Sequence, residues 1–383
     1  MTERTEPLRV GILGAARIAP LAIVSPAQAT GTRLVAVAAR DGARAEAFAA
    51  EHGVERVADS YASVLDDPEV EVVYNPLPHG LHAPWNIRAI EAGKHVLTEK
   101  PSAANAEQAR VVREVLRVAH GRVDGGRVDD GGADGGRADG GDLVFMEGFH
   151  YPYHPMFRRV VELIESGVVG DVRHIDVPLL MPDPGADDPR WQWDLAGGSV
   201  MDLGCYSLSC LKLLGERFCG GTPVVVSAEA QTRAEDGRVD ERLFARVAFP
   251  SGATGSGGSD MAADDWAFTL VVTGSEGEIV VPAFPLPHQD DRITVRAGGS
   301  STAVARTRPA EFAELAVERD GDRVERLGSR SSYTYQLEAL TAAVRDGAPV
   351  VTDADFAVGV MELIDSAYAA AGLPPRPSTA FGA

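Results

Sequence analysis

The first 148 residues alternate short, continuous apolar runs with longer segments in which apolar residues recur at helical spacing. A run without polar interruptions is typical of a strand that is buried on both faces. The pattern predicts strands at 8–13, 34–39, 70–74, 95–98 and 143–147, and helices at 17–29, 43–51, 60–65, 84–92 and 106–119. Such alternation predicts a parallel sheet that is covered by helices on both faces.

After Glu147 the pattern changes to runs with period-two character and turn residues between them. It predicts strands at 172–177, 224–231, 242–249, 266–273, 277–281 and 292–296, and helices at 156–166, 198–214, 333–345 and 355–371. The glycine-rich stretch 255–259 is predicted to be a soft, flexible tip. The chain is therefore predicted to be α/β, with a parallel-sheet domain at 1–148 and an α+β domain with a mostly antiparallel sheet at 149–383.

Residues 121–142 break the first pattern with a five-residue repeat of Gly, Asp, Arg and small residues. The segment has no aromatic residue and almost nothing to bury, so it is interpreted as a flexible surface insertion. An Asp-rich calcium repeat is the alternative. It is disfavoured because the large apolar residues that calcium-binding β-rolls stack are absent.

Composition then excludes several classes of protein. With 45% hydrophobic and 24% charged residues the chain is ordinarily globular, and a formal net charge of −20 argues against nucleic acid as a partner. Residues 1–7 are polar and charged, and no apolar stretch is long enough to span a membrane, so a cytoplasmic protein is expected. Neither the 3 Cys nor His79, His82 and His154 have metal-ligand spacing, and no metal is predicted.

The turn after the first strand carries Gly14, Ala15, Ala16, Arg17, Ile18 and Ala19. The dinucleotide fingerprint has Gly at the first, third and sixth of these places, and here Ala16 and Ala19 replace two of them. Ala still allows the backbone to approach a pyrophosphate at the following helix N-terminus. The motif predicts dinucleotide binding, and a turn packed by small residues is the alternative.

Arg40 ends the second strand, where an Asp or Glu would bind the ribose 2′-hydroxyl of NAD. Arg44 follows one helical turn later. A guanidinium can pair with a 2′-phosphate through two hydrogen bonds, so NADP(H) is predicted. NAD stays possible, because Asp41 could take the role of the missing acid or could simply cap the helix.

The fourth strand ends in Thr98-Glu99-Lys100-Pro101. The carboxyl ends of parallel strands are where such sheets bind ligands. The pKa of a Lys falls when the side chain is desolvated, which suits proton transfer. An ordinary exposed turn is the alternative.

Several segments together resemble the glucose–fructose oxidoreductase, inositol dehydrogenase and rhizopine catabolism (Gfo/Idh/MocA) family, and within it the dimeric dihydrodiol dehydrogenases and related NADP-dependent sugar oxidoreductases. They are GAARIA (14–19), NPLPHGLH (75–82), EAGKHVLTEKP (91–101), GGSVMDLGCY (197–206), YQLEAL (335–340) and AGLPP (371–375). The resemblance covers nearly the whole chain apart from 121–142. It implies that domain 1–148 is a dinucleotide-binding Rossmann domain, and that domain 149–383 binds substrate and mediates oligomerisation.

The resemblance also implies roles for individual residues. Lys100 would contact the reacting hydroxyl or carbonyl, Tyr206 would be the general acid/base, and Asp202, one turn earlier, would orient Lys100 or the substrate. An isolated Tyr has a pKa near 10, so Tyr206 needs a neighbouring cation, which Lys100 could provide. Without the resemblance, Asp202 as a helix cap and Tyr206 as a half-buried residue would be preferred. The further implied cofactor contacts are Glu99, Pro76, Leu77, Pro78 and His82, the implied substrate contacts include His150, Arg190 and Trp191, and the Lys100–Pro101 bond is expected to be cis.

The sequence thus predicts reversible hydride transfer between NADP(H) and a secondary alcohol or ketone of a sugar, polyol or dihydrodiol. Two alternatives stay open: a sugar-nucleotide ketoreductase of a biosynthetic pathway, and a non-catalytic dinucleotide sensor or co-repressor on the same fold. By analogy with the family, a homodimer or homotetramer is expected, paired through the outer face of the C-terminal sheet.

Overall fold

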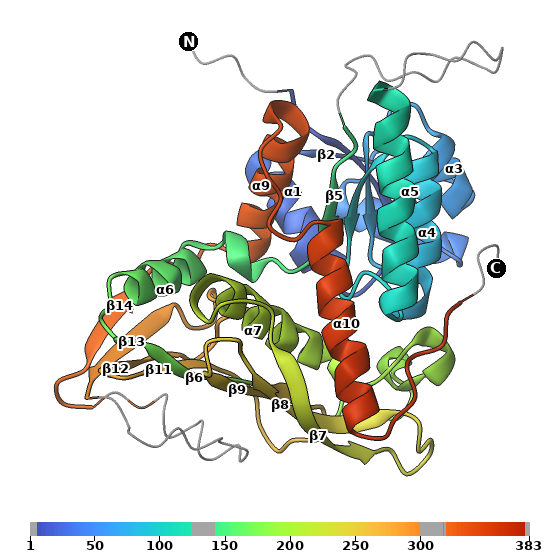
Figure 1. Ribbon diagram of the computed structural model, residues 1–383. Helices are drawn as coiled ribbons and strands as arrows, with labels where there is room; N and C mark the ends of the chain where they lie inside the picture. Colours follow the sequence, from blue (N-terminus) through green and yellow to red (C-terminus); the bar gives the residue numbers. More distant parts are fainter. Residues whose placement is uncertain (1–5, 125–141, 299–316, 318, 380–383) are drawn as a thin grey trace, which may run out of the picture. The chain divides into compact units, whose positions relative to one another are not determined.

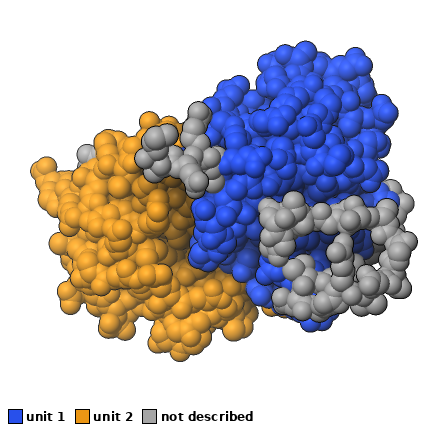
Figure 2. Space-filling model, turned by 90° about the horizontal axis from the view of Figure 1, so that it is seen from above, with its two compact units in different colours: residues 1–148, 336–358, 379–383 blue, residues 149–335, 359–378 orange. Residues whose placement is uncertain are grey.

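The computed structural model describes residues 6–124, 142–298, 317 and 319–379, which form two compact units (Figure 2). Unit 1 comprises Met1–Gly148, Gln336–Val358 and Thr379–Ala383, and unit 2 comprises Phe149–Tyr335 and Gly359–Ser378. Most of the predicted insertion at 121–142 lies outside the described residues. Within the described chain, no helix combines the length and the apolar character that crossing a bilayer requires.

Unit 1 contains a five-stranded sheet in the order β2-β1-β3-β4-β5, and every strand pair in it is parallel. The strands are β1 (Arg9–Leu13), β2 (Arg33–Ala38), β3 (Val72–Asn75), β4 (His95–Thr98) and β5 (Phe145–Glu147). Apart from Arg9 and Arg33 at their starts, their residues are buried, as the continuous apolar runs predict. The predicted parallel sheet is confirmed.

The connections between these strands are helical, as Figure 1 shows with α4 and α5 side by side. They are a π-helix (Pro20–Val24), α1 (Ser25–Thr30), α2 (Gly42–His52), α3 (Tyr61–Asp66), α4 (His79–Glu91) and α5 (Ala106–Asp124). Helix α4 begins five residues before the predicted start at Pro84. Gly80, His82 and Ala83 are buried, and this packing outweighs the hydrogen bond that Pro84 cannot donate.

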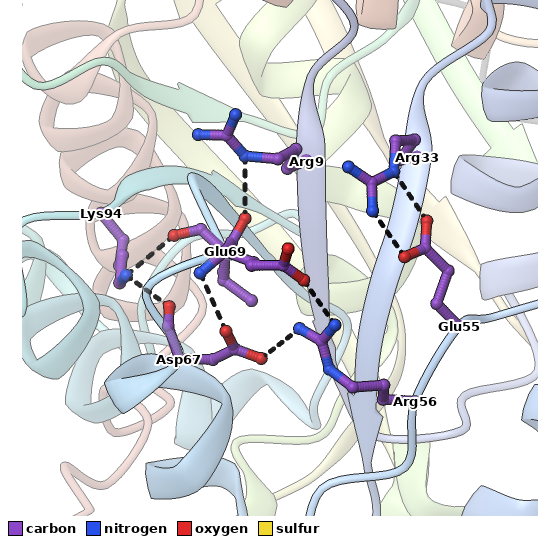
Figure 3. A network of polar contacts seen from close by, with 8 residues as sticks. Arg9, Arg33, Glu55, Arg56, Asp67, Glu69 and Lys94 are labelled. Atoms are coloured by element: carbon purple, nitrogen blue, oxygen red, sulfur yellow. Dashed lines mark hydrogen bonds and ion pairs between the residues drawn. The ribbon is translucent and has the colours of Figure 1, made fainter.

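Charged side chains lie at the amino ends of the strands, as Figure 3 shows. Arg33 pairs with Glu55 through two contacts of 2.8 and 2.6 Å, and Arg56 contacts both Asp67 and Glu69. Lys94 donates to the carbonyl oxygens of Asp67 and Val70 at 2.8 Å each. These contacts cover the sheet edge opposite the predicted cofactor residues.

The C-terminal part of the chain departs from the predicted division at 149–383, because residues 336–358 group with unit 1. They include most of α9 (Ser332–Asp346) and the start of α10 (Ala354–Ala370). Two backbone hydrogen-bonding groups at the end of β5 explain this grouping. The Glu147 N–H donates to Thr352 O at 2.8 Å, and the Thr352 hydroxyl donates to Glu147 O at 2.8 Å.

Unit 2 is built on a sheet in the order β14-β13-β12-β11-β6-β9-β8-β7, with β10 also paired to β6. Its strands are β6 (Val172–Leu180), β7 (Val224–Thr232), β8 (Asp240–Ala248), β9 (Thr254–Asp260), β10 (Ala267–Phe268), β11 (Leu270–Gly274), β12 (Gly277–Val281), β13 (Arg292–Ala297) and β14 (Arg323–Arg326). Among the described strands of unit 2, only the β6–β9 pair is parallel, which confirms the predicted, mostly antiparallel sheet. Helices α6 (Pro155–Glu165) and α7 (Cys205–Phe218) pack on this sheet (Figure 1).

The prediction of a flexible tip at 255–259 was wrong, because these residues form the buried strand β9 between β6 and β8. Their glycines leave room for α7. A Cβ on Gly257 would lie 2.9 Å from Leu211 Cδ1, and one on Gly255 would lie 3.0 Å from Leu211 Cδ2. The stretch predicted as one strand at 266–273 is divided between β10 and β11, and β14 was not predicted.

Candidate active site

The predicted cofactor residues lie at the carboxyl edge of the unit 1 sheet. Gly14 follows β1, Arg40 lies two residues after β2, Pro76 follows β3 and Glu99 follows β4. The strand order reverses direction between β1 and β3, which is the point where open parallel sheets bind ligands. Leu77, after β3, reaches this point, because a Cβ on Gly14 would lie 3.2 Å from Leu77 Cδ2.

The turn at Gly14 has the backbone geometry that a dinucleotide needs. Gly14 has φ of +98°, a conformation that residues with side chains rarely adopt. Its N–H donates to Ala38 O at 2.6 Å, which holds the turn against β2. Ala15 and Ala16 are half-buried, Arg17 is exposed and Ile18 is half-buried, so small side chains leave the backbone of the turn open. The residues present therefore fit a pyrophosphate.

The two arginines after β2 are exposed, and one of them contacts this turn. The Arg44 guanidinium donates to Ala15 O at 2.9 Å. The Asp41 carboxylate caps α2 by accepting from Ala43 N and Arg44 N at 3.0 and 3.4 Å. A guanidinium therefore lies beside the Gly14 turn, whereas the neighbouring acid, Asp41, caps the helix.

A buried network supports the segment that carries Lys100. Asn86 Nδ2 donates to Thr98 Oγ1 and to Ser102 O, both at 3.2 Å, and Asn75 Nδ2 donates to Asn86 Oδ1 at 2.8 Å. These amides tie the end of β3 to the segment after β4. The Lys100–Pro101 peptide is cis, as the resemblance implies.

His82 lies within this network and joins two loops of the carboxyl edge. Its Nδ1 is 2.7 Å from Pro101 O and its Nε2 is 2.5 Å from Leu77 O. Burial lowers the His82 pKa to about 4, although the two carbonyl groups oppose this shift. His82 is completely buried, so this geometry supports a positioning role beneath the predicted cofactor residues.

Glu147, at the end of β5, is a buried carboxyl that the sequence did not mark. Its Oε1 accepts from Ser102 N at 2.7 Å, and burial raises its pKa to about 7. The opposing influences are hydrogen bonds from Ser102 and the charge of Lys100. Its Oε2 is buried with no hydrogen-bond partner among the described residues. Glu99, by contrast, accepts from the Tyr74 hydroxyl at 2.8 Å.

In unit 2, the predicted acid/base Tyr206 lies in the first turn of α7, which directly follows a π-helix (Val200–Gly204). Its hydroxyl lies 3.0 Å from His150 Nε2, and His150 Nδ1 lies 2.8 Å from Ser332 Oγ. Tyr206 is 7% exposed, and His150 and Ser332 are completely buried. The structure thus brings together two predicted site residues, Tyr206 and His150, and adds Ser332.

Asp202, on the π-helix, is also paired with a predicted site residue. Arg190 Nη1 contacts Asp202 Oδ2 at 3.1 Å, and Arg190 Nε contacts Asp188 Oδ1 at 2.9 Å. Although burial opposes it, the two carboxylates raise the Arg190 pKa above its usual value. Trp191 is buried, and its indole N–H donates to Asp183 Oδ1 at 3.3 Å. Whether these residues bind substrate stays a prediction.

The segment before Asp202 and Tyr206 is anchored by an ion pair that sequence reasoning missed. Arg376, completely buried, contacts the Asp240 carboxylate and donates to Gly197 O at 2.6 Å. Asp240 accepts from Ser199 Oγ at 2.8 Å and from Val200 N at 2.9 Å. The only sequence signal near this anchor was the Gly197-Gly198 pair. It does not reveal the charged partners, Arg376 and Asp240, which are 136 residues apart in the sequence.

Sequence and structure comparisons relate both units of the chain to known oxidoreductases. A family model described as an oxidoreductase family with an NAD-binding Rossmann fold matches residues 8–124, and the GFO/IDH/MocA C-terminal domain matches residues 157–280. A D-xylose 1-dehydrogenase (NADP(+)) of Haloferax volcanii is 34% identical over 365 residues, which are 94% of this chain and 96% of that protein. A trans-1,2-dihydrobenzene-1,2-diol dehydrogenase of Mus musculus is 32% identical over 65% of this chain and 67% of its own length.

Among solved structures, a 3-ketoreductase from Actinomadura kijaniata in complex with NADP and TDP-benzene is similar throughout. It has a TM-score of 0.77 and 25% identity, and the match covers 95% of this chain and 98% of the other. The likeness extends across both units, so it is not limited to the dinucleotide-binding half.

Proposed function

Because the chain belongs to the Gfo/Idh/MocA oxidoreductase family, we propose that it is an NADP(H)-dependent oxidoreductase acting on a secondary alcohol or ketone of a sugar or polyol. The observation that carries the cofactor preference is the contact of Arg44 with Ala15 O, beside the Gly14 turn. It supports a cationic site for a 2′-phosphate next to the pyrophosphate turn.

A fluorescence titration with NADPH and, in parallel, with NADH tests the cofactor proposal. We expect micromolar NADPH binding, with NADH much weaker. Arg44→Ala and Arg40→Ala should weaken NADPH binding and leave NADH binding unchanged, because only NADPH carries the 2′-phosphate. Equal binding of both cofactors by the unaltered protein would contradict the preference. Binding of neither, to protein free of carried-over cofactor, would contradict the whole proposal.

The proposed chemistry divides between the two units. When bound, the dinucleotide supplies or accepts the hydride. Lys100, at the carboxyl edge of unit 1, would stabilise the negative charge that develops on the substrate oxygen. Tyr206, in unit 2, would exchange the proton of that oxygen. Asp202, held by Arg190 at 3.1 Å, would orient the substrate hydroxyl groups.

The charge pairing around Asp202 favours a neutral sugar or polyol over a sugar nucleotide. A diphosphate requires cationic partners, but Arg190 already pairs with Asp188 and Asp202, and Arg233 pairs with Asp183 at 2.9 Å. A panel of D-xylose, D-glucose, myo-inositol and a dTDP-sugar, each with NADP⁺, tests this choice. Turnover restricted to the dTDP-sugar would support the ketoreductase alternative instead.

We also propose that copies of the chain associate through the outer face of the unit 2 sheet. A cavity of about 300 Å³ lies on β7, β8 and β9, and Phe244, Arg242 and Glu229 are among its lining residues. Val224 and Val226, on β7, are each 66% exposed. Sedimentation of Phe244→Asp should show a shift towards monomer, and an unchanged sedimentation coefficient would contradict this interface.

A further inference from the structure

The surroundings of Tyr206 in unit 2 suggest a way for this tyrosine to exchange a proton with a substrate at neutral pH. A tyrosine with a pKa near 10 keeps its proton at pH 7 and cannot by itself accept another from a substrate hydroxyl. The Tyr206 hydroxyl, however, lies 3.0 Å from His150 Nε2. Histidine has an ordinary pKa of about 6.5 and exchanges protons in this pH range.

Ser332 and Tyr333, the first residues of α9, hold the His150 ring in place. Ser332 Oγ is 2.8 Å from His150 Nδ1 and 3.5 Å from Pro285 O. The Tyr333 ring stacks on His150 with a centroid distance of 3.8 Å and an angle of 33°. If the Ser332 hydroxyl donates to Pro285 O, its oxygen accepts from Nδ1–H. The lone pair of Nε2 then faces the Tyr206 hydroxyl, because a neutral imidazole carries one N–H.

We propose that Ser332, His150 and Tyr206 form a proton relay, and this proposal rests on the proposed oxidoreductase function. During oxidation the substrate O–H proton passes to Tyr206 Oη while the proton of Tyr206 passes to His150 Nε2. The hydrogen on the substrate carbon leaves with the electron pair of the C–H bond, as a hydride to the nicotinamide, and the C=O bond forms. His150 holds the proton as imidazolium and returns it through Tyr206 to water after the product leaves. Reduction follows the reverse order.

The groups packed around the pair are compatible with a transient cation on His150. The ring centroid of Tyr151, from the 3₁₀ turn Tyr151–Tyr153, lies 6.2 Å from that of Tyr206. The Tyr151 hydroxyl is hydrogen-bonded to Ser209 Oγ at 2.9 Å. Tyr333 offers its ring face to His150, an arrangement that favours a positive charge. Asp202, one turn before Tyr206, has its charge matched by Arg190.

His150→Gln tests the relay, because the glutamine amide can still hydrogen-bond to Tyr206 but cannot take its proton. We expect the kcat for oxidation by NADP⁺, measured with the panel sugar that turns over fastest, to fall about 10²-fold near pH 7. The loss should shrink at alkaline pH, because hydroxide ion can then take up the proton in place of His150. A purely structural defect would lower kcat by the same factor at every pH, and that result would overturn the relay.

Two serine variants serve as matched comparisons. Ser332→Ala removes the partner of Nδ1 and should give a smaller loss of kcat with the same pH trend. Ser209→Ala removes a buried hydroxyl that contacts Tyr151 and the backbone oxygen of Tyr206, and it should leave the pH profile of kcat unchanged. Equal pH profiles for Ser332→Ala and Ser209→Ala would contradict the role of Ser332.

A measurement that needs no turnover tests the relay independently of the activity assay. In ¹⁵N-histidine-labelled protein, we expect the resonances that disappear in His150→Gln to report a ring protonated at Nδ1, and the Nε2 signal to shift in Tyr206→Phe. A ring protonated at Nε2 would overturn the relay even in an active enzyme. No turnover of any panel sugar by the unaltered protein would instead overturn the proposed function, and the relay with it.

Discussion

The two edges of the parallel sheet in unit 1 hold their polar side chains in opposite ways. At the amino edge, the ion pairs are exposed to solvent (Figure 3). Their side chains include Arg33, Arg56 and Glu69, which are 45%, 42% and 51% exposed. At the carboxyl edge, Asn75, Asn86, His82 and Glu147 are completely buried. They are joined by hydrogen bonds to backbone and to one another, with few charges among them.

The difference shows what each edge can do. Exposed ion pairs are screened by water and contribute little, so the amino edge tolerates change. A buried polar group is costly to leave without its partner, so the carboxyl edge holds its loops in one arrangement. That edge can keep Lys100 and the predicted cofactor residues in fixed positions, which the proposed catalysis by a preorganised charge requires.

The largest expected contrast is between two lysines, one at each edge. Lys100→Met should lower kcat by about 10²–10⁴-fold and leave the NADPH dissociation constant nearly unchanged, because it removes a charge needed in the transition state. Lys94→Met should leave kcat unchanged but destabilise the fold by about 1–2 kcal/mol, because two carbonyl groups lose their donor. Steady-state kinetics and urea unfolding measure both effects.

The reverse result would break this contrast. If Lys94→Met lost turnover while Lys100→Met kept it, the assignment of chemistry to the carboxyl edge would be wrong. A loss of NADPH binding equal to the loss of kcat in Lys100→Met would indicate a structural role for that residue.

The next effect concerns the pH dependence of stability. Burial raises the Glu147 pKa from 4.5 to about 7, so the folded protein binds a proton that the unfolded chain releases between these values. The stability from Glu147 is complete below pH 4.5 and is lost as the pH rises through 7. Relative to Glu147→Gln, the protein should lose about 3 kcal/mol across this window. Urea unfolding of both proteins from pH 4.5 to pH 8 measures the difference.

Glu71, at the amino edge, provides the comparison of opposite sign. Burial acts to raise its pKa, but the hydrogen bonds and charge of Arg345 lower it overall. The pair therefore contributes stability above the ordinary glutamate pKa, which is lost as the pH falls. Glu71→Gln should thus be destabilised at neutral pH and approach the unaltered protein in acid. Parallel curves for the Glu71 and Glu147 variants would contradict the contrast.

Local sequence patterns were sufficient to predict the outline of the carboxyl edge. Gly14, Arg40, Leu77 and Glu99 each follow an apolar run, and the parallel order of these runs brings their ends to one edge. The network beneath them could not be predicted in the same way. Glu147 looked like the last residue of a strand, and its burial depends on Ser102, 45 residues earlier. Ser332 reaches His150 across 182 residues.

The error at 255–259 has the same physical origin. Glycine-rich sequence is typical of flexible loops, and nothing local reports that a helix packs on it. The glycines of β9 are required by Leu211 of α7, a residue about 45 positions earlier. Patterns therefore predicted elements and their ends, whereas contacts between distant residues decided burial.

Two glycines, one near each edge, allow the backbone packing of the two edges to be compared. A Cβ on Gly148 would lie 2.9 Å from Thr98 O and 3.2 Å from Glu99 Cα, so Gly148→Ala should cost about 1–3 kcal/mol and displace the segment that carries Lys100. Gly93 ends α4 with φ of +70° and has no neighbour within 4 Å of an added Cβ. Gly93→Ala should cost about 1 kcal/mol through backbone strain alone and keep full kcat. Equal kcat in both variants would contradict the prediction.

The smallest expected effect is at the Arg33–Glu55 pair of the amino edge. Its two contacts of 2.8 and 2.6 Å are well formed, but the side chains are 45% and 36% exposed. Arg33→Gln should lower the thermal midpoint by no more than about 2 °C at low salt. The difference should vanish in 1 M NaCl, where the Debye length is about 3 Å. Turnover should not change at either salt concentration, because the pair lies at the opposite end of the strands from Lys100. A fall in kcat would show that the amino edge, despite its exposure, helps to fix the carboxyl edge.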